Sequence, residues 1–202
     1  NLNTLSLHDA LPILPFSVAS ALLADSIAFF LEYGEELVNY YLALARNGQD
    51  VRGLPLPVPP KLAKLGIVRW RSVAETREAF FTELRSGACL HNMLEVLLGA
   101  IAVLVNTLMA RRASELVDLR PDSIVEKAGM YFLGFDLRKA NVLEHRKRML
   151  RPMPTLAAEA LQLLARLSQG LGEMGYPIGG RLFEVPFSAW NGARPFFGTT
   201  LP

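Results

Sequence analysis

A continuous apolar segment near the middle of the chain, Met93–Met109 (MLEVLLGAIAVLVNTLM), constrains the fold more than any other feature. Its apolar residues cover almost every face of a helix, so a helix from about Leu90 to Met109 has to be surrounded by other elements. The segment is shorter than the ~20 residues that span a bilayer, and it contains Glu95 and Asn106. We therefore expect it to be the central helix of a helical domain, with membrane insertion as the alternative.

A second helical pattern runs from Ser17 to Arg46, where large apolar residues recur every three or four positions. Gly34 is the point at which this segment would divide into two helices. Its aromatic residues have the spacing of a core, which we favour over a surface for stacking on bases. The apolar stretch Leu11–Tyr33 lacks a basic leading segment and is interrupted by charged residues, so we do not interpret it as a signal or a membrane span.

A proline-rich stretch at residues 53–60 (GLPLPVPP) predicts a linker. After it, Ile67–Arg71 is expected to be a short strand or an extended passage. Ser72 and Glu75 have the spacing of a capping box, which predicts a helix through Arg85. Residues 15–88 are therefore expected to form a helical N-terminal region.

The chain changes character after Pro121-Asp122, which is expected to end a short helix over Ala113–Leu119. Ser123–Leu137 contains two runs of strand-forming residues on either side of Ala128-Gly129, and this pattern predicts a β-hairpin. The segment MLRPMP that follows is expected to add an edge strand, where proline is tolerated. Thr155 is expected to cap a helix that continues to about Met174. The predicted fold is mainly α with a small antiparallel three-stranded sheet.

Charge is distributed unevenly, although the formal net charge is only +2. Arg138–Arg151 contains many basic residues and a single acid, Glu144, which favours a polyanion partner over a merely solvated loop. The chain has one cysteine, Cys89, so an internal disulfide is excluded. We expect Cys89 to be a small buried residue and the protein to work in the reducing cytoplasm.

The stretch Thr107–Ile124 (TLMARRASELVDLRPDSI) resembles the first motif of the tyrosine recombinase (phage integrase) family, which reads approximately T-G-L-R-x-S-E-L. The segment Arg112–Leu116 matches R-x-S-E-L. Ala110 stands where the family has glycine, and Arg111 stands where it has an apolar residue. The resemblance covers about residues 90–171, and it implies the N-terminal half of a catalytic domain over residues 89–202.

This resemblance also implies a chemistry. A tyrosine hydroxyl attacks a DNA phosphodiester, and a planar guanidinium stabilises the charge that develops on the phosphate oxygens. Arg112 is the expected phosphate ligand, Lys139 is the expected general acid to the leaving oxygen, and Glu115 supports the arginine. No metal or other cofactor is required. The residues expected to contact double-stranded DNA are Arg111, Arg138, Arg146, Lys147 and Arg148.

The family also requires a second motif, H-x-x-R, and a nucleophilic tyrosine. His145–Arg148 matches H-x-x-R literally, and Tyr176 follows it. However, His145 comes too soon after Arg112 and falls within the basic turn, so we favour a chain that stops before its second motif. The N-terminal end also suggests a truncated gene, since residues 1–13, which include TLSLHDALPI, resemble translated sequencing-adapter DNA and make residues 1–14 an expected artefactual N-terminus. We expect them to be an artefact of assembly.

These observations predict a fragment of a recombinase for site-specific DNA recombination or integration, inactive on its own. The full-length protein would form a homo-oligomer on DNA, in the cytoplasm and without a membrane. The alternative is a non-enzymatic helical domain that binds DNA or serves as a scaffold.

Overall fold

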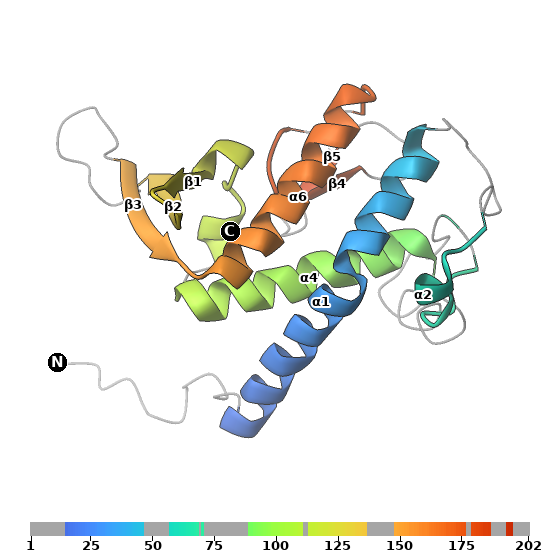
Figure 1. Ribbon diagram of the computed structural model, residues 1–202, viewed down its shortest axis with the longest axis horizontal. Helices are drawn as coiled ribbons and strands as arrows, with labels where there is room; N and C mark the ends of the chain where they lie inside the picture. The colour runs from blue at the N-terminus through green and yellow to red at the C-terminus, as the bar shows by residue number, and fades with distance from the viewer. Residues whose placement is uncertain are drawn as a thin grey trace, which may run out of the picture.

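The computed structural model describes residues 15–46, 57–68, 70, 89–110, 113–136, 148–176, 179–186 and 193–195. In these ranges helices predominate, with a small antiparallel sheet at one end (Figure 1). The mainly α fold with a three-stranded sheet that the sequence predicts is therefore confirmed.

Helix α4 (Leu90–Met109) lies across the middle of the molecule, and α1 (Phe16–Arg46) and α6 (Thr155–Glu173) both pack against it (Figure 1). Leu97, Leu98 and Ile101 lie on one side of α4 and are fully buried, and Ala100 and Ala102, on either flank of that side, are buried too. The prediction of a central helix is confirmed, and the remaining side of α4, at Val96 and Val103, is only partly buried. Cys89, also fully buried, begins this helix, and its sulfur accepts a hydrogen bond from the backbone N–H of Asn92 at 3.3 Å.

Helix α1 is continuous through Gly34, so the division into two helices that this glycine suggested is wrong. Gly34 is buried because α1 meets α6 there. A Cβ at this position would lie 3.1 Å from the side chains of Leu163 and Phe30. Gly170 of α6 has the same role opposite Leu42 of α1, where a Cβ would lie 2.9 Å away. The two glycines allow the helices to approach closely at two separate points.

The three-stranded sheet has the order β1-β2-β3, with β1 at Ile124–Lys127, β2 at Met130–Asp136 and β3 at Arg148–Met153. Leu133 pairs with Ile124 on one side and with Arg151 on the other. Leu133 and Met153 are buried in the main core, so this face of the sheet covers the helices. Pro152 lies in the edge strand β3, as the sequence predicts, because an edge position leaves one side without a ladder.

Shorter elements complete the described chain: α2 (Pro60–Ala63), α5 (Ala113–Leu116), the 3₁₀ helix η2 (Pro121–Ser123), and a pair of strands, β4 (Glu184–Pro186) and β5 (Ala193–Pro195). The strands β4 and β5 lie in a tail for which the sequence showed no periodicity. Pro60, the last residue of the linker predicted at 53–60, starts α2.

Some sequence predictions are wrong, and others concern residues that the structure does not describe. Thr155 is the first residue of α6, and Pro154 occupies the cap position without a side-chain hydrogen bond, so the prediction of a Thr155 cap is wrong. Ile67 and Val68 are not in a strand, so for these residues the strand alternative is wrong and the extended passage stays a prediction. Residues 1–14 and the helix predicted over 72–85 lie outside the described residues.

The turn between β1 and β2 allows a direct test of the hairpin. Ala128 and Gly129 both have positive φ, 50° and 74°, as a type I′ turn requires. Asparagine tolerates this conformation better than alanine does. We expect Ala128→Asn to raise the free energy of unfolding by about 0.5–1 kcal/mol in urea denaturation. Ala28→Asn, on the exposed side of α1, is the control and should lower it slightly; equal effects of the two changes would contradict the turn assignment.

Candidate nucleic-acid interface

The motif-bearing segment begins where α4 ends. Ala110 takes the left-handed conformation, with φ 48° and ψ 49°, and its N–H donates to the carbonyl oxygen of Asn106. Left-handed backbone is unfavourable for alanine by about 1–2 kcal/mol and is usually reserved for glycine. The chain turns here from α4 toward α5. Met109 before the turn and Leu116 after it are both buried, and their burial offsets the strain.

The structure describes some of the predicted site residues and not others. Glu115 lies in α5 and is partly buried. Arg148 is the first residue of β3. The other predicted residues lie outside the described residues: Arg111, Arg112, Arg138, Lys139, Arg146 and Lys147. The pairing of Arg112 with Lys139 on one phosphate therefore stays a prediction.

The hairpin places the ends of the basic segment together. Asp136, the last residue of β2, pairs directly with Arg148, the first residue of β3. The intervening segment, residues 137–147, therefore leaves and re-enters the sheet at the same point. Arg151 lies on the edge strand, is exposed, and places its guanidinium 5.7 Å from the ring centre of Phe135. A cation held over an aromatic ring keeps its charge available to an anion.

Sequence reasoning missed a set of contacts, called the clasp below, that joins Asp118 and Leu119 of the motif segment to Arg181 and Leu182 near the C-terminus. The N–H of Leu182 donates to the carbonyl oxygen of Leu119 at 2.8 Å. The Arg181 guanidinium lies 3.9 Å from a carboxylate oxygen of Asp118 and 4.0 Å from one of Glu184. Glu184 is buried and also accepts a hydrogen bond from the backbone N–H of Arg181 at 3.2 Å.

The clasp fixes the stretch that follows Glu115. Leu116 and Leu119 are buried on one side of it. Ser123 and Arg120 exchange two hydrogen bonds, at 3.1 Å to the serine hydroxyl and 2.9 Å to the arginine carbonyl. The only sequence signal for the clasp was the Arg181–Glu184 spacing in a glycine-rich tail, and that spacing does not identify Asp118 as a partner.

Metal ligands and membrane spans were also considered. Within the described ranges, no group of three or more His, Cys, Asp or Glu side chains is placed to hold a metal ion. Two helices are long and apolar enough to cross a membrane, α1 and α4. In α4, 56% of the apolar window is buried in the protein, whereas in α1, near the N-terminus, only 6% is buried. Cytoplasmic location and the absence of a membrane therefore stay predictions.

Comparisons of the chain with protein-family models, with curated proteins and with solved structures found no match. The site is therefore argued from its own residues.

The clasp makes a testable contribution to stability. Arg181→Ala would leave the buried Glu184 carboxylate without its cation, so we expect the free energy of unfolding to fall by about 1–3 kcal/mol. The control is Arg166→Ala, which removes an exposed ion pair with Glu35 at 3.3 Å and should cost no more than about 1 kcal/mol. Denaturant titrations of both variants provide the comparison.

A second substitution separates charge from packing. In the Arg181→Ala background, Glu184→Gln should restore part of the lost stability, because a neutral amide needs no buried counter-charge. A double variant that is less stable than Arg181→Ala alone would contradict the role assigned to this pair.

Proposed function

We propose that this chain binds double-stranded DNA as the N-terminal half of a tyrosine recombinase catalytic domain. In this proposal Arg112 binds the phosphate, Lys139 is the general acid, and Glu115 supports Arg112. The fragment is inactive on its own, because no convincing second motif or nucleophilic tyrosine accompanies them. Its activity in a longer protein would be site-specific recombination or integration.

The observation that carries the proposal is the order of elements around the motif. A buried helix is followed by the short helix α5, which holds the last four residues of R-x-S-E-L, then by a three-stranded antiparallel sheet and a long helix. This is the order that the resemblance implies. The conformation of Ala110 adds support, since the family pattern has glycine there and the backbone is left-handed.

The chemistry agrees with the residue types. A guanidinium presents two parallel N–H donors to a phosphate, and a lysine ammonium supplies a proton without a metal ion. Glu115 lies three residues after Arg112 in the sequence, in the short helix α5. A carboxylate at that position can hold the guanidinium in one orientation. Arg112 and Lys139 both follow fixed ends of the framework, Ala110 and Asp136, by no more than three residues.

The distribution of charge favours the same end of the molecule for DNA. The basic residues 138, 139, 146 and 147 are joined to the paired strand ends Asp136 and Arg148. By contrast, α1 carries four acids and a single base, Arg46. A phosphate backbone would be attracted to the sheet end and repelled by α1.

Salt dependence tests the DNA contacts. The triple variant Lys139→Ala/Arg146→Ala/Lys147→Ala should bind a fluorescent duplex more weakly than the parent chain. The slope of log K against log salt is negative, and each lost phosphate contact reduces its magnitude by about 0.9. The measurement is fluorescence anisotropy over a series of potassium chloride concentrations.

The matched control removes the same charge elsewhere. Arg46→Ala/Lys61→Ala/Lys64→Ala changes three exposed cations, Arg46 in α1, Lys61 in α2 and Lys64 just after α2. It should leave the slope close to that of the parent chain. If both triple variants lower the slope equally, binding depends on net charge alone and the proposed interface is wrong.

A second test separates a recombinase from a DNA-binding module without catalysis. The genomic sequence following codon 202 should encode, in frame, an H-x-x-R motif and a later tyrosine. Their presence supports the recombinase proposal. A stop codon or an unrelated domain at that place would leave only DNA binding.

A further inference from the structure

Arg151 lies in β3, the edge strand of the three-stranded sheet (Figure 1). It pairs in register with Leu133, whose side chain is 1% exposed and belongs to the main core. Two residues further along β3, Met153 is buried in the same core. The neighbouring strand and the chain beyond Arg151 are therefore both anchored, so this exposed side chain starts from a backbone that the core holds in place.

The side chains around Arg151 carry no charge. Residues that pair directly, or that lie two positions apart in one strand, share a face of the sheet. By this rule the nearest neighbours of Arg151 on its face are Tyr131, Leu133, Phe135, Met149 and Met153. The nearest acid on that face by register is Glu126 of β1, which lies beyond β2, about 10 Å across the sheet. Within the described ranges, Arg151 forms no ion pair with Glu126 or with another carboxylate.

The ring of Phe135 orients this guanidinium. Phe135 is half-buried in β2, diagonally across from Arg151, and its ring centre lies 5.7 Å from the guanidinium carbon. This distance is within the range of cation–π attraction, which holds an arginine near a ring without neutralising it. The positive charge of Arg151 therefore stays uncompensated while its position is restricted.

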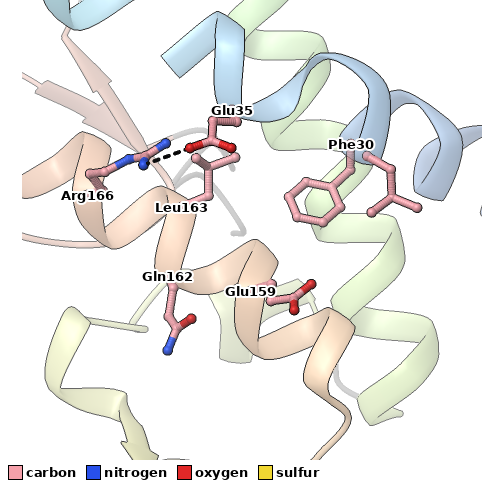
Figure 2. Close-up of a pocket in the computed structure, with 7 residues that line it drawn as sticks. Phe30, Glu35, Glu159, Gln162, Leu163 and Arg166 are labelled. Atoms are coloured by element: carbon pink, nitrogen blue, oxygen red, sulfur yellow. Dashed lines mark hydrogen bonds and ion pairs between the residues drawn. The ribbon is translucent and has the colours of Figure 1, made fainter. Parts of the chain in front are cut away.

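Two other arginines show the contrasting arrangement. Arg166 meets Glu35 at 3.3 Å beside the groove between α1 and α6, as Figure 2 shows. Arg181 is held by two carboxylates of the clasp, at 3.9 and 4.0 Å. A cation with such partners attracts a further anion only weakly, because the nearby negative charge offsets its own. Arg151 has an aromatic ring in place of a carboxylate, so its charge can act on a ligand.

We propose that Arg151 binds a phosphate of duplex DNA and that Phe135 is the residue that positions it. This inference rests on the proposed function, to which it adds a contact made by the folded sheet itself. Arg148 begins the same strand three residues earlier, about 10 Å along it, where the basic segment 137–147 rejoins the sheet. A duplex that meets the basic segment at Arg148 therefore passes close to Arg151. A guanidinium suits a phosphate because it presents two parallel N–H donors.

The alternative is that Arg151 only covers apolar surface. Arginine stems often lie over apolar side chains and leave the charged end in water, and this role requires no ligand. The two roles depend on different parts of the side chain: covering depends on the stem, and phosphate binding depends on the charge. Methionine keeps an unbranched apolar stem and removes the charge, so Arg151→Met separates the two roles.

The test measures binding of the full 202-residue chain to a fluorescent DNA duplex by anisotropy, over a series of potassium chloride concentrations. Arg151→Met should reduce the magnitude of the slope of log K against log salt by about 0.9 and weaken binding about fivefold to tenfold at ~0.1 M salt. Its thermal unfolding should be unchanged, because the stem is kept. The matched control is Arg46→Met, the same substitution at the exposed last residue of α1, and it should leave the slope unchanged.

Two substitutions of Phe135 test its positioning role. Phe135→Leu keeps the charge of Arg151 and removes the ring, so binding should weaken about twofold to fivefold with little change in the slope. Phe135→Tyr keeps a ring and should bind DNA as the parent chain does. Thermal unfolding of both variants is measured alongside, because Phe135 is half-buried and its replacement by leucine can also affect packing.

The outcomes distinguish this inference from the proposed function. If the triple variant of the basic segment reduces the magnitude of the slope while Arg151→Met binds as Arg46→Met does, the proposed interface stands and Arg151 is not part of it. Equal affinities of Phe135→Leu and the parent chain would remove the positioning role. If the parent chain shows no salt-dependent binding to the duplex, the proposed function is wrong and the role of Arg151 is wrong with it.

Discussion

The burial of α4 is the constraint on which the rest of the structure depends. A helix with apolar residues on nearly all faces cannot be covered by one neighbour, so α1 and α6 pack on it together and also meet each other. Gly34 and Gly170 allow that meeting, because each leaves room for a side chain of the opposite helix. The sheet and the clasp then close the end of the core at which α4 stops.

Features that depend on neighbouring residues were predictable from the sequence, and features that depend on distant ones were not. The hairpin is encoded in strand-forming residues on either side of Ala128-Gly129, and α4 in its own composition. Gly34 was misjudged because a glycine in a helix can mark either a break or a close contact, and only the position of Leu163 decides between them. The clasp joins Asp118 to Arg181 across a long stretch of chain, which no local pattern reveals.

The candidate site shows the same difference between features that neighbouring residues determine and features that distant residues determine. The sequence identifies R-x-S-E-L and a basic segment, and the structure supplies the framework on which they begin: the left-handed turn at Ala110 and the paired ends Asp136 and Arg148. Whether a guanidinium and an ammonium meet at one phosphate depends on side chains beyond that framework. The pattern of residue types predicts a chemistry, but the distance between two charges is a property of the folded chain alone.

The separation of charge gives the molecule two different surfaces. At the sheet end, the sequence places basic residues between the paired strand ends Asp136 and Arg148, and Arg151 lies over Phe135, which favours a polyanion at this end. Among the described residues, the groove between α1 and α6 is lined by the exposed Glu159 and by the ion pair of Glu35 with Arg166. The charge distribution therefore distinguishes the end of the sheet, between whose strands the sequence places its basic segment, from α1, which carries four acids and one base.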